Sequence, residues 1–370
     1  MKFIKALAVL LGTIIGVGIF GLPYAASKAG LAVMFFYLII MSALIAKMHL
    51  IYADIIAEDN NNRRLPGFVG EYLGSFWKYF VFLVIAVGMT GSSIAYLIIG
   101  GEFLHYLLSP LLGGAPILYS LLFFALGSLL VFKGIKTIAN LEIILSMVLL
   151  AILFFISWKA VPFINIGNFA SFSPQFILFP YGIVIFSLWG SNAIPELKEI
   201  AGKGSLKKII LAGVFASALV YLIFIAAVLG VSGTGVSKDA ISGLLYFLGP
   251  GVLGLGFIFG VISCFTSYIT LSLSFKKTLW YDLKLNKNIS WAAASFVPLI
   301  LFLFGIKRFI PVMNFTGAVS LGLESFVLII LYRAFLKKKF GLKINPLYYI
   351  LAVVFAAGAA FEIFNIFVNI

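Results

Sequence analysis

The sequence predicts an all-α polytopic membrane protein with about eleven transmembrane helices. Of its 370 residues, 63% are hydrophobic and 10% are charged, and the mean hydropathy is +1.18. A soluble domain of this length has no core large enough to bury so much apolar surface. The apolar residues also fall into separate runs with basic residues between them. The single cysteine, Cys264, excludes an intramolecular disulfide framework.

The apolar runs are long enough, or nearly so, to cross a hydrocarbon layer about 30 Å thick as helices. The first run is too long for a signal peptide and lacks a small-residue cleavage site. The expected helices cover approximately residues 6–28, 30–53, 77–108, 115–132, 135–158, 174–200, 206–230, 249–275, 289–305, 308–332 and 346–368.

The positions of the Lys and Arg residues predict the orientation in the membrane. With the N-terminus in the cytoplasm, all but five of the 26 basic residues lie in cytoplasmic segments, as the positive-inside rule requires. We therefore expect a multi-pass protein of the cell (inner or plasma) membrane, with a cytoplasmic N-terminus and the C-terminus outside. The outer basic residues are Lys28, Lys159, Lys238, Lys307 and Arg308.

The first expected helix is interrupted near its middle. The stretch GTIIGVGIFGLPY, residues 12–24, has glycines at 12, 16, 18 and 21 and a proline at 23. These residues weaken a helix at the depth where unmade backbone hydrogen bonds are most costly. Broken backbone at that depth is tolerated where it lines a cavity or is covered by protein. Close helix packing through small residues is the alternative interpretation.

The sixth expected helix repeats this interruption. Gly190, Ser191, Asn192 and Pro195 fall near its midspan, and the polar Ser–Asn pair needs partners there. Because proline is tolerated in the first turn of a helix, Pro23 and Pro195 are each expected to start a second half-helix. Interrupted helices five apart indicate an inverted repeat of two five-helix halves, with a binding site between the breaks.

This pattern predicts the division of the chain. Residues 1–345 form an inverted-repeat transporter core, with repeat one over 6–158 and repeat two over 174–332. Residues 346–370 add a C-terminal transmembrane helix.

The two breaks suit a zwitterionic ligand. A half-helix that starts near Gly18 presents unpaired N–H groups and a partial positive charge, which favour a carboxylate. The first half of helix six ends near Ser187 to Gly190 with free carbonyls, which favour an ammonium group or a cation. An α-amino acid carries both charges on one carbon, and we therefore expect it as the ligand.

Three stretches carry a family resemblance. GTIIGVGIFGLPYA at 12–25, SIAYLIIGGEFL at 93–104 and SLWGSNAIPELKEI at 187–200 are similar to segments of the amino acid–polyamine–organocation superfamily. The first resembles most its amino acid/auxin permease branch, which includes the hydroxy and aromatic amino acid permeases. The resemblance implies the five-plus-five inverted-repeat fold of the leucine transporters, to which one helix is added.

The resemblance also implies binding residues. Val17 and Gly18 would offer N–H groups to the substrate carboxylate, and Ser187 and Gly190 would offer carbonyls to its amino group. A sodium position would be formed by carbonyl and hydroxyl oxygens of Gly12, Ile15, Ser263, Thr266 and Ser267. The alternative is that these hydroxyls only bond the carbonyl one turn back in their own helix.

Two other residues that couple transport to an ion in the superfamily are absent from this sequence. Ile19 stands where its second sodium position has an asparagine, and the core of helix five lacks the lysine that proton-coupled relatives have. The sequence therefore leaves Na⁺ and H⁺ open as coupling ions.

Single side chains complete the predicted site. Phe20, Tyr96 and Trp189 are candidate pocket walls, and Ser92 and Asn192 are candidate polar contacts. Glu324 lies well inside the membrane, either as a coupling or gating carboxylate or paired with a hydroxyl or a lysine. His49 is expected to be merely interfacial, and the stretch EDNNNRR, residues 58–64, is expected to be a solvated turn.

We therefore interpret the chain as a secondary active symporter of neutral amino acids, aromatic or branched, coupled to Na⁺ or H⁺ by alternating access. An amino acid-binding sensor and a carrier of a nucleobase or polyamine are the alternatives. No catalytic residues are predicted, since no clustered catalytic pattern lies within the membrane. We expect no cofactor besides Na⁺, no nucleic acid and no obligate protein partner; the partners are the amino acid and the lipid bilayer.

Overall fold

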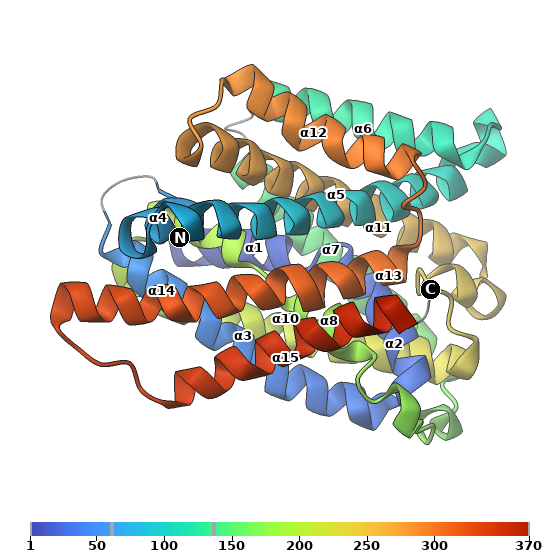
Figure 1. Cartoon of the computed structure of the whole chain (residues 1–370). Helices are drawn as coiled ribbons and strands as arrows, with labels where there is room; N and C mark the ends of the chain where they lie inside the picture. The colour runs from blue at the N-terminus through green and yellow to red at the C-terminus, as the bar shows by residue number, and fades with distance from the viewer. Residues whose placement is uncertain (1, 60–62, 135–137, 369–370) are drawn as a thin grey trace.

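The computed structural model describes residues 2–59, 63–134 and 138–368, and within these ranges the chain is almost entirely helical (Figure 1). Seven helices are long and apolar enough to cross a membrane, an eighth span is a bent pair, and further apolar helices are shorter. The predicted all-α polytopic membrane fold is confirmed. In chain order the spans are α1–α2 (Lys2–Ile14 and Gly18–Ala29), α3 (Leu31–Ala57), α5 (Ser75–Leu112), α6 (Pro116–Lys133), α7 (Ile138–Ala160), α8–α9 (Pro180–Leu188 and Ile194–Ala201), α10 (Lys203–Ser232), α11 (Leu245–Lys277), α12 (Lys287–Leu303), α13–α14 (Phe309–Asn314 and Gly322–Phe340) and α15 (Leu347–Val368).

The first and sixth spans are both broken, as predicted. The axes of α1 and α2 differ by 53° across residues 15–17. In the sixth span, Trp189 adopts an extended conformation and a 3₁₀ turn, η4 (Ser191–Ala193), precedes α9. Pro195 lies in the first turn of α9, as expected. The expectation for Pro23 is wrong, because α2 already begins at Gly18 and Pro23 lies inside it.

The tenth span contains a further irregularity that the sequence did not reveal. Between α13 and α14 lies a π-helical segment, η8 (Phe315–Leu321), which packs against α8. At Gly317 a side chain would meet the backbone of Gly182, so the two helices approach with no room for a Cβ. Such π-helical segments are frequent at functional sites.

The broken spans lie at the centre of the bundle. The first half-helix, α1, packs against α7, α9 and α10, and α2 packs against α8 and α10. The spans α5 and α11 pack along each other, and α15 packs against α14 and η8 (Figure 1).

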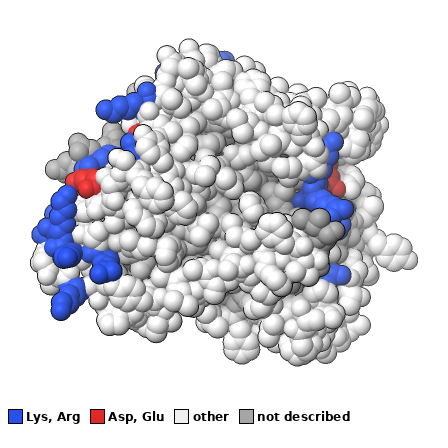
Figure 2. Space-filling model, viewed as in Figure 1, with Lys and Arg blue, Asp and Glu red and all other residues white. Residues whose placement is uncertain are grey.

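The charged side chains leave a wide uncharged band across the face shown in Figure 2. Figure 2 shows Lys and Arg gathered at two opposite ends, with more of them at the end that holds α4 (Leu65–Leu73). The last described helix, α15, ends on the opposite side from α4 (Figure 1). With the long apolar helices, this distribution is that of a multi-pass membrane protein.

Candidate functional site

A cavity of about 50 Å³ lies between the two breaks. Of the predicted substrate contacts, its lining includes Gly18, Ser92, Tyr96, Trp189 and Asn192. A space of this size holds about three or four water molecules, so the pocket walls must move apart to admit an amino acid.

Two of the other predicted contacts lie next to this cavity without lining it. Val17 caps the start of α2. Phe20 is fully buried, and its ring meets Phe103 and Phe259 edge-on, with centroids 4.9 and 5.6 Å away. Phe20 therefore belongs to a buried aromatic cluster and not to the lining of the cavity.

Ser187 connects the two broken spans. Its hydroxyl oxygen lies 3.1 Å from the Gly18 carbonyl oxygen and 2.7 Å from the Ile183 carbonyl oxygen, the two acceptors for its one proton. The Tyr221 hydroxyl, fully buried on α10, lies 2.7 Å from both the Ser187 and the Ile14 carbonyl oxygens. The Tyr221 side chain thus links the end of α1 to the end of α8 by hydrogen bonding. Nothing in the sequence distinguishes Tyr221, because it is one of 16 tyrosines in an apolar chain.

Gly190 is held by a histidine from the second span. The Gly190 N–H donates to His49 Nε2 at 3.2 Å, and the Gly190 carbonyl accepts from the Ala193 N–H at 3.1 Å. His49 is fully buried, and its ring lies edge-on to Trp189 with centroids 5.3 Å apart. The expectation that His49 is merely interfacial is wrong, because α3 passes directly behind the break of the sixth span.

Gly16, in the break of the first span, has no room for a side chain. A Cβ there would lie 2.7 Å from the Tyr96 hydroxyl and 2.9 Å from the Ser267 hydroxyl. The missing side chain therefore lets α5 and α11 bring polar groups up to the broken backbone.

The residues of the predicted sodium position do come together. The Ser267 hydroxyl donates to the Gly12 carbonyl and the Ser263 hydroxyl donates to the Ile15 carbonyl, each at 3.0 Å. The Thr266 hydroxyl instead bonds within its own helix, to the Ile262 carbonyl at 3.0 Å and the Ser263 carbonyl at 3.2 Å. The result is a set of uncharged oxygen atoms at the junction of α1 and α11. Such oxygens are the donors that a hard cation prefers.

Glu324 closes the cavity on one side. Its side chain is 5% exposed, and Oε1 accepts a hydrogen bond of 3.0 Å from the Ser191 hydroxyl in the break of the sixth span. Glu324 also lines a second cavity, of about 20 Å³, together with Tyr52, Arg64, Asn192 and Ser274.

The comparisons with known proteins identify the family. The model of the tryptophan/tyrosine permease family matches residues 1–364. The chain belongs to this family. A search of curated protein sequences found no significant match.

Solved structures agree with the permease fold. MhsT in complex with L-phenylalanine is 17% identical, with a TM-score of 0.70 over 98% of this chain and 97% of MhsT. Mhp1, a nucleobase-cation-symport-1 family transporter in a closed conformation with bromovinylhydantoin bound, is 13% identical, with a TM-score of 0.72 over 94% of this chain and 80% of Mhp1. Both have the leucine-transporter fold, which confirms the predicted fold class. The permease is therefore a secondary transporter and not an enzyme.

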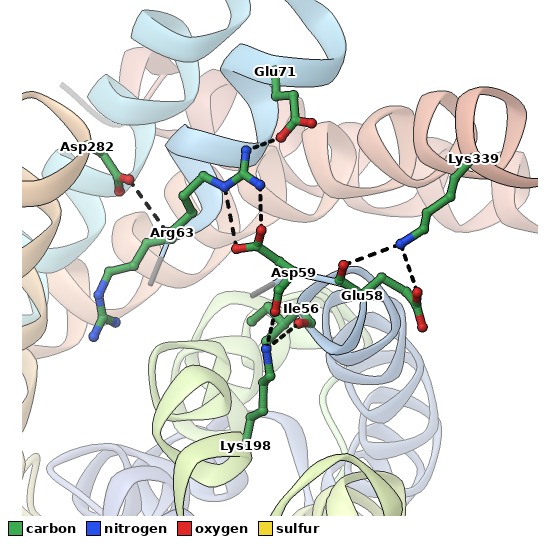
Figure 3. A network of polar contacts seen from close by, with 9 residues as sticks. Ile56, Glu58, Asp59, Arg63, Glu71, Lys198, Asp282 and Lys339 are labelled. Atoms are coloured by element: carbon green, nitrogen blue, oxygen red, sulfur yellow. Dashed lines mark hydrogen bonds and ion pairs between the residues drawn. The ribbon is translucent and has the colours of Figure 1, made fainter. Parts of the chain in front are cut away.

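A network of ion pairs lies at the end of the permease that holds α4 (Figure 3). Arg63 pairs with Asp59 and Glu71. The Lys198 ammonium donates to the carbonyls at the end of α3, and Lys339 pairs with Glu58 at 2.8 Å. The hydrogen bond from Lys339 lowers the pKa of the Glu58 carboxyl.

Arg64 is the buried member of this network. Its guanidinium bonds Glu196 Oε1 at 2.5 Å and the Ser274 hydroxyl at 3.0 Å, and Lys277 lies 3.4 Å from the same Glu196 oxygen. Burial opposes the charge of Arg64, but the adjacent Glu196 carboxylate outweighs it and raises the pKa of the guanidinium. The expectation of a solvated turn is therefore wrong for Arg64, which is 8% exposed.

The permease also has a larger apolar groove, of about 720 Å³, between α5, α12, α13 and α15. It shares no lining residue with the cavity between the breaks, and the polar groups of the two breaks do not reach it. We therefore place the candidate site in the smaller cavity.

Proposed function

We propose that this permease is a symporter of neutral amino acids, with an aromatic substrate held between the two breaks. The observation that carries the proposal is the meeting of two opposite helix ends at one cavity, the start of α2 and the end of α8. The first N–H groups of α2 favour a carboxylate, and the last carbonyls of α8 favour an ammonium group.

The cavity walls support an aromatic side chain. Tyr96, Phe186 and Trp189 line it, and ring contacts of this kind add about 0.5–1.5 kcal/mol beyond the burial of area. The name of the family specifies tryptophan and tyrosine, and MhsT was solved in complex with L-phenylalanine. A polyamine is disfavoured, because Glu324 is the single acidic residue among the described residues that line the cavity.

The oxygen set of Gly12, Ile15, Ser263, Thr266 and Ser267 is the candidate site for Na⁺. Two of its hydroxyls donate to two of its carbonyls, so the set is internally satisfied without a metal ion. Na⁺ would replace these hydrogen bonds, and it would stiffen the break beside the substrate. We propose the same division of the chain as the sequence indicates, with a core over 1–345 that holds the repeats 6–158 and 174–332, and an added C-terminal helix over 346–370.

Uptake into proteoliposomes tests the proposal. Purified protein is reconstituted and supplied with radiolabelled L-tryptophan, L-tyrosine, L-phenylalanine, L-leucine or spermidine, under an imposed Na⁺ or H⁺ gradient. We expect accumulation of an aromatic amino acid that collapses when the driving gradient is removed. Binding without uptake or exchange would indicate a sensor, and preferential uptake of spermidine would contradict the substrate class.

A further inference from the structure

Glu324 is a carboxyl group placed between two cavities inside the membrane-spanning bundle. It lines both the cavity between the breaks and the 20 Å³ cavity on the side of Arg64. The Ser191 hydroxyl is its hydrogen-bond donor at 3.0 Å. Glu324 is the one ionisable residue that lines both cavities among the described residues.

No basic side chain in the described part of the chain forms an ion pair with Glu324. Arg64 lines the smaller cavity, but its guanidinium is bonded to Glu196 and Ser274. The other groups around Glu324 are Tyr52 of α3, with Trp189 and Ser191 at the break. From α5 only Ile85 and Met89 line both cavities, and Glu362 of α15 lines the apolar groove with Arg308.

Burying an ionised carboxylate without a cation carries a large desolvation cost. A proton removes that cost most simply, since the neutral carboxyl then needs only hydrogen bonds. In this structure the nearby cation, the Arg64 guanidinium, is bonded to Glu196 and Ser274. The geometry therefore favours a protonated Glu324 while Arg64 remains on Glu196.

We propose that Glu324 is a proton-binding site of the transport cycle and that Arg64 alternates between Glu196 and Glu324. While Glu324 carries a proton, Arg64 stays on Glu196 and the α4 end is closed. When Arg64 leaves Glu196, Glu324 releases its proton to water on that side, and the O–H bond is replaced by an ion pair with Arg64. The role in transport rests on the proposed function, but the proton site itself does not.

Infrared difference spectroscopy in proteoliposomes, from about pH 5 to about pH 9, tests the proton site without a substrate. We expect wild type to show a carbonyl stretching band of a protonated buried carboxyl group that titrates and is absent from Glu324→Gln. The matched control is Glu102→Gln, which changes a carboxyl group outside both cavities and should leave the band in place. A band that persists in Glu324→Gln, or a wild type without one, would overturn the proposal.

Arg64→Gln tests the exchange of partners. Without the guanidinium the ionised carboxylate loses its cation, so the midpoint of the band should move to higher pH by about one unit or more. An unchanged midpoint would overturn the role of Arg64. Adding L-tryptophan to wild type should then shift the same midpoint. If the band titrates and no amino acid shifts it, the proposed function fails while the proton site stands.

Discussion

At the scale of single residues, two of the side chains whose polar contacts shape the site lie outside the two breaks. His49 accepts the Gly190 N–H, and Tyr221 bridges the Ile14 and Ser187 carbonyls. A buried N–H that loses its acceptor costs roughly 1–3 kcal/mol. These side chains therefore determine whether the break keeps the conformation that lines the cavity.

The first prediction concerns His49. His49→Leu removes the acceptor, and we expect it to weaken binding of L-tryptophan at least about tenfold, as 1.4 kcal/mol does. His49→Gln keeps a side-chain acceptor and should recover most of the affinity. Isothermal titration calorimetry on the purified variants measures the dissociation constants. Wild-type affinity in His49→Leu would show that the contact does not position the break.

The second prediction concerns Gly18. A Cβ at this position would lie 2.7 Å from Ser187 Cα, which is backbone and yields little. We expect Gly18→Ala to destabilise the protein by about 1–3 kcal/mol, measured as a lower thermal unfolding midpoint. Gly204→Ala is the control, since a Cβ there meets nothing within 4 Å. Equal midpoints for the two variants would contradict the close approach of α2 and α8.

At the scale of helices, α11 and the broken first span form the candidate cation site. Na⁺ that binds the native state raises its melting temperature by mass action. The third prediction is that Ser267→Ala abolishes the rise in melting temperature that Na⁺ buffer produces relative to choline buffer. The control is Ser295→Ala, which removes a buried hydroxyl of α12 and should keep this rise. If wild type shows no rise, or if Ser267→Ala retains it, Na⁺ does not bind at this junction.

The ion pairs at the α4 end connect α9, α11 and the segment before α4. Removing one partner of a buried pair is strongly destabilising because the other charge is left unpaired. The fourth prediction is that Arg64→Ala speeds amide hydrogen exchange in α9 by about tenfold or more. Lys207→Ala breaks the exposed pair with Asp54 (63% and 31% exposed) and should leave exchange in α9 unchanged. A similar response of both variants would contradict a closing role for Arg64.

The helices were more predictable than the contacts between them. Glycine and proline act on the local backbone, so residues 12–24 and 187–196 indicated both breaks, and apolar run length indicated every span. His49, Tyr221 and Arg64 each have a partner more than 100 residues away in the chain. Such long-range pairings depend on which face a helix turns inward, and an evenly apolar helix gives no periodic signal for that.

At the scale of the whole molecule, the charge distribution gives a prediction about orientation. The α4 end, with the larger share of Lys and Arg, should face the cytoplasm (Figure 2). With Cys264 replaced by alanine, single cysteines at Lys2 and at Asn369 can be labelled on intact cells with a membrane-impermeant maleimide. We expect labelling at the C-terminal position only. Labelling at Lys2 would reverse the orientation.

The central claim is that an aromatic amino acid binds between the two breaks. The most direct measurement is the thermal unfolding midpoint of the purified protein with a panel of amino acids, each in Na⁺ and in choline buffer at two pH values. We expect aromatic amino acids to raise the midpoint, as a ligand of the native state must, and lysine and glutamate to leave it unchanged. A midpoint unchanged by every amino acid in all four buffers would contradict it.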